Sequence, residues 1–208
     1  MTPEEILQIF IERHRLVSPL DPEADETIIL SMYSTVDDWR DACDLLPWHG
    51  LAKALDDEFE MNATDEEWRS VLKPSYKRTL QDVCNFIGKK SKKGAIEPVK
   101  LFGKECLSAA VFKALKNNLS QRNIDTNDIA PSSEISPYIE KYLGEIITET
   151  TFLSKGKKVF DSFKPKLKKR GFWNYINIFD NDRYTYPTGG VKTFRDLTLK
   201  IVEAKTSE

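Results

Sequence analysis

The sequence predicts an all-α fold, a multi-helix bundle that forms either one body or two helical subdomains. Three observations predict it. Several segments begin with a threonine followed three positions later by an acidic residue, apolar residues then recur at helical spacing, and proline or glycine separates the segments. Strand is expected only in a small β-hairpin near residues 172–187, an aromatic and β-prone stretch.

The first fifty residues contain two such helix starts. The sequence Thr2-Pro3-Glu4-Glu5 has a capping threonine, a proline at the first helical position and a glutamate at the third, and it predicts a helix to about Leu16. The prolines of residues 18–22 end this helix. A short helix is expected over residues 27–32. Thr35 then opens another, which runs to Pro47.

Residues 49–88 predict three helices in a row. Leu51, Leu55 and Phe59 mark the apolar side of the first helix. Thr64 caps a short second helix that Pro74 ends, and Thr79 caps the third.

This stretch resembles the second half of an acyl carrier protein. The resemblance rests on three motifs, Ala54-Leu55-Asp56-Asp57-Glu58-Phe59, Thr64-Asp65-Glu66-Glu67 and Thr79-Leu80-Gln81-Asp82-Val83-Cys84-Asn85-Phe86-Ile87. It covers at most residues 1–88 and implies a carrier-like helical fold. In that family the phosphopantetheine serine lies nine residues before the alanine, where this chain has Leu45 in Asp44-Leu45-Leu46. We therefore expect no phosphopantetheine attachment, because leucine has no hydroxyl to modify.

The formal charge changes sign at residue 88, where the carrier-like stretch ends. Residues 1–88 contain 8 Lys and Arg and 19 Asp and Glu, a formal charge of −11, so the rest of the chain carries +9 of the total −2. We expect an acidic helical subdomain over residues 1–88 and a basic helical subdomain over residues 95–208, joined by the lysine-rich residues 89–98. The two parts either face each other or meet different partners.

The second part predicts two long helices. Residues 99–119 carry the longest helical pattern, residues 123–133 form a polar loop, and Ser136-Pro137 opens a helix through Ile147. The segment from Thr193 to Ile201 then matches that from Thr79 to Ile87 in its cap, its third-position aspartate and its apolar spacing. Either a carrier-like unit is duplicated, or two helices share one way of capping.

The candidate contact site is the most basic stretch of the chain. Its residues for contact with an anion or a partner are Lys155, Lys157, Lys158, Lys166, Lys168, Lys169 and Arg170. Phe160 and Phe163 interleave with these cations, a combination that also occurs in proteins that bind nucleic acids.

Three functions are compatible with these patterns. The favoured one is a non-catalytic protein-interaction module in the cytoplasm, with a protein partner and with neither membrane contact nor cofactor or metal. One alternative is an enzyme with a carboxylate or thiol site, for example Asp37, Asp38 and Asp41 near Cys43. The other is a nucleic-acid-binding protein that uses residues 155–170. No catalytic residue is assigned.

Overall fold

The computed structural model describes residues 1–93, 96, 98–101, 103–164, 166–167 and 184–206. Within them the chain forms eight α-helices, a short 3₁₀ helix and four strands of two or three residues, so the predicted mostly α-helical fold is confirmed. In the same residues, no helix combines the length and the apolar character that crossing a membrane requires.

Five helices come from residues 1–93, and four of them begin as predicted. The side chains of Thr2, Thr35, Thr64 and Thr79 each accept a hydrogen bond from the third backbone N–H of a helix, and the acidic side chain at that position bonds back to the threonine N–H. The elements are α1 (Pro3–Val17), the 3₁₀ helix η1 (Ser18–Leu20), α2 (Val36–Cys43), α3 (Trp48–Phe59), α4 (Asp65–Leu72) and α5 (Leu80–Lys90).

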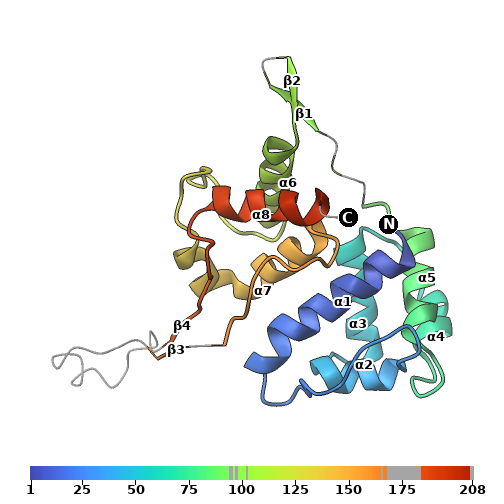
Figure 1. The fold of residues 1–208 in the computed structure, drawn as a ribbon. Coiled ribbons are helices and arrows are strands. Elements are labelled where there is room, and N and C mark those ends of the chain that lie inside the picture. Colours follow the sequence, from blue (N-terminus) through green and yellow to red (C-terminus); the bar gives the residue numbers. More distant parts are fainter. Residues whose placement is uncertain (94–95, 97, 102, 165, 168–183, 207–208) are drawn as a thin grey trace.

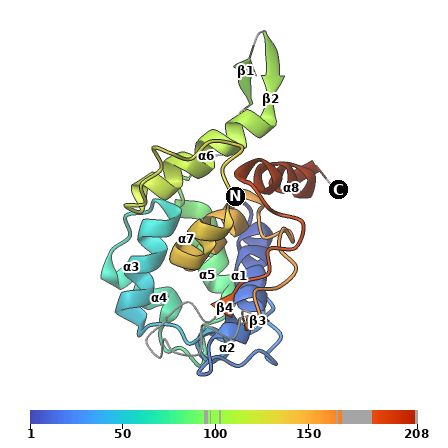
Figure 2. The ribbon, with the colours of Figure 1, turned by 90° about the vertical axis from the view of Figure 1, so that its left-hand side faces the viewer.

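The remaining elements are three helices and two strand pairs. In chain order they are β1 (Val99–Leu101), β2 (Lys104–Cys106), α6 (Leu107–Gln121), α7 (Ser136–Leu153), β3 (Lys166–Leu167), β4 (Tyr184–Thr185) and α8 (Phe194–Thr206). The helix α7 is kinked at Tyr142, whose backbone is not helical. The hairpin β1–β2 projects from the body of the molecule beyond the start of α6 (Figures 1 and 2).

Two sequence predictions were wrong. The helix expected from Val99 begins only at Leu107, because residues 99–101 pair in antiparallel fashion with residues 104–106. Gly103, which precedes the second strand, has φ +80°, a conformation that favours glycine. The helix expected over residues 27–32 is absent. There, Ser31 and Ser34 instead close a turn, in which the N–H of Ser31 donates to the Ser34 hydroxyl and the N–H of Ser34 to the Ser31 carbonyl.

The hairpin predicted near residues 172–187 falls largely outside the described residues, which resume at Tyr184. Its described end, β4, pairs in antiparallel fashion with β3, with Lys166 opposite Thr185 and Leu167 opposite Tyr184.

One core joins the two parts that the charge pattern separates. The helix α1 packs against α5 and against α7, and α6 packs against α7 and α8 (Figure 1). Large side chains from both parts, such as Phe59 and Phe160, belong to a single cluster of buried apolar residues. The division into subdomains at residues 88 and 95 remains a prediction.

The two similar helix starts share more than a cap. Thr79, at the start of α5, forms an isolated antiparallel bridge with Thr35, and Thr193, at the start of α8, forms one with Glu134. Three backbone hydrogen bonds surround each bridge in the same order. At the first bridge, the N–H groups of Val36, Leu80 and Gln81 donate to the carbonyls of Arg78, Ser34 and Met32, respectively. At the second bridge, the N–H groups of Ile135, Phe194 and Arg195 donate to the carbonyls of Lys192, Ser133 and Pro131. The likeness therefore includes the segment that each helix start is tied to.

Candidate functional site

The structure divides the predicted contact residues into three groups. Lys155, Lys157 and Lys158 lie in the connection that follows α7. Lys166 lies in β3, and Lys168, Lys169 and Arg170 lie outside the described residues. The site can therefore be built from the first group.

Helix α8 brings further lysines to this connection. Lys157, Lys158 and Lys200 line an open groove of about 400 Å³, together with Asp161, Glu203 and two small apolar side chains. We call this the lysine groove. Within it, the carboxylate of Asp161 lies 3.1 Å from the Lys158 ammonium. The hydrogen bond from Lys158 lowers the pKa of Asp161, and the charges of Lys158, Lys200 and Arg15 lower it further. The groove thus carries three ammonium groups and two carboxylates, a formal charge of +1.

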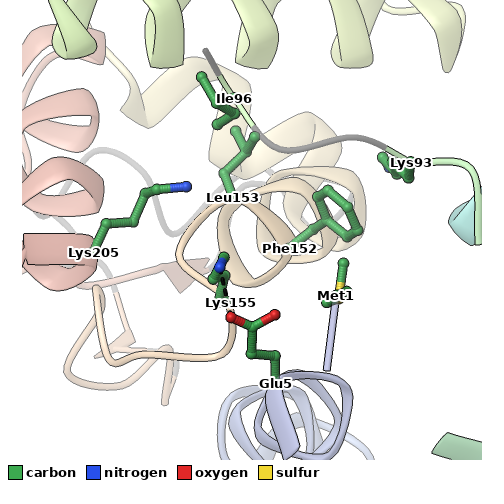
Figure 3. Close-up of a pocket in the computed structure, with 8 residues that line it drawn as sticks. All are labelled: Met1, Glu5, Lys93, Ile96, Phe152, Leu153, Lys155 and Lys205. Carbon is green, nitrogen blue, oxygen red and sulfur yellow. Dashed lines mark hydrogen bonds and ion pairs between the residues drawn. The ribbon is translucent and has the colours of Figure 1, made fainter. Parts of the chain in front are cut away.

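A smaller pocket lies further along α8 and the same connection. It has a volume of about 80 Å³ and is lined by Met1, Glu5, Lys93, Ile96, Phe152, Leu153, Lys155 and Lys205. We call it the Lys205 pocket. In Figure 3 the ammonium of Lys205 points into it from α8, while Lys155 reaches down to the carboxylate of Glu5 on α1. The Lys155–Glu5 ion pair measures 2.5 Å.

The turn that carries Lys155 and Lys157 is held in place by α1. Lys155 and Gly156 have left-handed backbone conformations, with φ values of +56° and +75°. The buried Ser154 hydroxyl donates to the carbonyl of Lys157, and the N–H of Gly156 donates to the carbonyl of Thr151. Gly156 lies so close to the backbone of Gln8 and Ile9 that there is no room for a Cβ atom. A packed turn therefore positions these lysines.

The aromatic residues of the basic stretch are not part of this surface. Phe160 and Phe163 are 1% and 0% exposed, and their rings pack on each other with centroids 4.7 Å apart. Stacking of bases needs exposed ring faces. In the structure these two rings belong to the core.

The predicted carboxylate and thiol group, Asp37, Asp38, Asp41 and Cys43, lies on α2, and of its members Cys43 alone is among the residues that line the neighbouring cavity. Cys43 lines a cavity of about 210 Å³ between α1, α2 and α3, where burial raises the pKa of its thiol to about 12. Asp38 is engaged as the capping carboxylate of Thr35. Among the described residues, no three or more His, Cys, Asp or Glu side chains are placed to hold a metal ion.

Sequence reasoning missed Lys200 and Lys205. They are separated from Lys155 by more than forty residues, and α8 has only three Lys and Arg against two Asp and Glu, a formal charge of +1. A helical projection of residues 194–206 separates Lys200 from the buried Phe194, Leu197 and Ile201, but it does not say which surface lies next to it.

A scan against models of protein families and searches of curated proteins and of solved structures find no match to this chain.

Proposed function

We propose that this protein is a non-catalytic interaction module that docks an acidic surface of a protein partner in its lysine groove. The observation that carries the proposal is the meeting of Lys157 and Lys158 with Lys200 in one open groove. Cations from two distant segments gather there on rigid elements, a packed turn and a helix. Positive surfaces of this kind steer and hold partners of opposite charge.

The chemistry of the other candidate sites supports a binding role over a catalytic one. A thiol acts as a nucleophile in its thiolate form, and burial keeps the Cys43 thiol protonated near neutral pH, with a pKa of about 12. The burial of Phe160 and Phe163 removes the aromatic residues on which the nucleic-acid alternative depended. Lysine, a compact and strongly hydrated charge, suits an exposed acidic protein surface.

A labelled polyglutamate peptide tests the proposal by fluorescence anisotropy. We expect it to bind the full chain at low salt and to bind at least about tenfold more weakly when Lys157, Lys158 and Lys200 are replaced by glutamate. The matched control replaces the exposed Lys53, Lys89 and Lys113 by glutamate, which changes the net charge equally. Equal weakening by both triple variants would show that net charge alone acts, and the groove would then have no specific role.

A labelled single-stranded oligonucleotide is the second arm of this experiment. We expect it to bind more weakly than the peptide at the same ionic strength. Tighter binding of the oligonucleotide, lost in the Lys157, Lys158 and Lys200 variant, would replace the proposal with the nucleic-acid alternative.

A further inference from the structure

The Lys205 pocket differs from the lysine groove in that its charge lies against apolar walls. Phe152 and Leu153, at the end of α7, are almost fully buried and form one side of the pocket (Figure 3). The ammonium of Lys205 enters from the opposite side. A site with a few polar groups set among apolar side chains is the usual composition of a small-molecule pocket.

The cations that line the pocket differ in their partners. Lys155 pairs with Glu5, and the amino terminus of Met1 adds a second positive charge near the same carboxylate. The Lys93 ammonium donates to the carbonyl of Glu58, lies 3.8 Å from Glu149 and lies 4.0 Å from the ring centroid of Phe152. Among the described residues, Lys205 makes no hydrogen bond or ion pair. Its three N–H donors are therefore available to a ligand.

We propose that the Lys205 pocket binds a small carboxylate with a short apolar tail, its carboxylate held by the Lys205 ammonium and its tail against Phe152 and Leu153. A volume of about 80 Å³ holds about three water-sized groups at roughly 30 Å³ each, so the carboxylate and the first carbons of an acid such as butyrate enter the pocket and the end of the tail lies at its open mouth. A carboxylate with an apolar tail fits better than inorganic phosphate. The side of the ligand that points away from Lys205 meets apolar walls, and phosphate oxygens on that side would have no hydrogen-bond partner.

The electrostatics of the pocket agree with this assignment. Burial lowers the pKa of Lys205, and the positive charge of Lys155 lowers it further, against the opposing effect of Glu5. An anion beside Lys205 would offset both effects. This site stands apart from the proposed docking function, since it uses a different cavity and a different lysine of α8.

A titration monitored by NMR tests the assignment in the full chain. Reductive methylation with ¹³C labels each lysine amine, and the Lys205 signal is identified by its loss in Lys205→Met. We expect butyrate to shift that signal saturably, with half-saturation below about 50 mM at constant ionic strength. Butanol and butylammonium should leave it in place, because neither offers an anion. Inorganic phosphate should bind at least about tenfold more weakly than butyrate.

Two variants on one helix give the matched comparison, with backbone NMR shifts of residues that line the pocket as the readout. We expect Lys205→Met to weaken butyrate binding about tenfold or more. Lys200 lies on the same helix but in the lysine groove, so Lys200→Met should bind butyrate with an affinity within about twofold of the parent protein. Comparable backbone spectra of the two variants confirm that both fold. The assignment would be overturned if butanol bound as well as butyrate, if phosphate bound more tightly, or if butyrate gave no saturable shift. It would also be overturned if both variants lost butyrate affinity equally. Binding of polyglutamate in the groove is measured separately and does not depend on this result.

Discussion

The ammonium of Lys155 and the carboxylate of Glu5 lie 2.5 Å apart and tie the turn after α7 to the first helix of the chain. This ion pair joins the basic part of the chain to the acidic part, as does that between Lys164 and Glu26 at 3.4 Å. The first pair is partly exposed and the second is exposed, so each contributes only about 0.2–1 kcal/mol. The shared apolar core buries many large side chains, and its contribution to the free energy of folding far exceeds that of two ion pairs. The core must therefore hold the two parts together.

Glu5→Gln should destabilise the protein at neutral pH and not in acid. Burial raises the pKa of Glu5, but the hydrogen bonds from Lys155 and from the N–H of Thr2 outweigh it, and the pKa in the folded state lies below the usual 4.5. The carboxylate thus stabilises the fold above its unfolded pKa, and this contribution is lost as the pH falls through the folded pKa. We expect a loss of about 1 kcal/mol at neutral pH in urea unfolding.

Glu4→Gln is the control for this prediction, because Glu4 is an exposed neighbour in the same helical turn and forms no ion pair with any residue that the structure describes. It should change stability by no more than about 0.5 kcal/mol. A difference between Glu5→Gln and the parent protein that stays constant down to strongly acidic pH would contradict the assigned role of the carboxylate.

Gly156→Ala should be strongly destabilising. The residue has φ +75°, and an added Cβ would meet the backbone of Gln8 and Ile9. A left-handed conformation costs a residue other than glycine about 1–2 kcal/mol, and the clash adds about 1–3 kcal/mol. We expect the free energy of unfolding to fall by about 2–5 kcal/mol.

Gly144→Ala provides a contrast of opposite sign. Gly144 lies within α7, and a Cβ atom there would have nothing within 4 Å outside the local helix. Alanine is the better helix former by about 0.5–1 kcal/mol, so this variant should be neutral or more stable. If Gly156→Ala were tolerated as well as Gly144→Ala, the turn that holds Lys155 and Lys157 would not be packed on α1 as described.

Local signals predicted the helix starts because the interactions that make them are local. The bonds of a capping box span three residues, so Thr2, Thr35, Thr64 and Thr79 could be recognised from sequence alone. The hairpin at residues 99–106 was missed for a related reason. Its apolar residues continue the helical spacing of α6, and the turn at Gly103 is the one signal that separates them.

The lysine groove was only partly predictable. The density of positive charge pointed to Lys155, Lys157 and Lys158, whereas the contribution of Lys200 depends on where α8 packs. For Phe160 and Phe163, the sequence predicted a contact role that the structure does not support. Spacing among lysines suggested a stacking surface, but two large aromatic rings gain more free energy from burial in the core than from exposure.

The similar starts of α5 and α8 should contribute equally to stability. Thr79 and Thr193 each accept a hydrogen bond from the N–H three residues on, at 3.3 and 3.2 Å, and each N–H donates to the aspartate at that position. Replacing either threonine by alanine removes the cap and should lower the free energy of unfolding by about 0.5–2 kcal/mol. The corresponding serine variants keep the hydroxyl and should lose less than half of that. An alanine effect at one site only would show that the two starts differ despite their shared hydrogen-bond pattern.

The three cysteines should react with a thiol reagent at very different rates. Burial raises the pKa of Cys43 and of Cys84 to about 12, so at about pH 8 only about one in 10⁴ of these thiols is ionised. Cys106 lies 3.3 Å from the Ser108 hydroxyl at the start of α6. The hydrogen bond with that hydroxyl, and then the bond from the N–H of Ala109, lower its pKa. With dithiobis(nitrobenzoate) we expect one fast thiol in the native chain and three after unfolding.

Ser108→Ala should slow the fast thiol by removing the hydrogen bond that favours the thiolate. Ser120→Ala, at an exposed position near the other end of the same helix, should leave its rate unchanged. Assignment of the fast site to Cys106 by peptide mass mapping completes the measurement. Three thiols that react at one common rate in the native protein would mean that Cys43 and Cys84 are reached by opening of the fold, and that α2 and α5 are held far less tightly than their buried side chains imply.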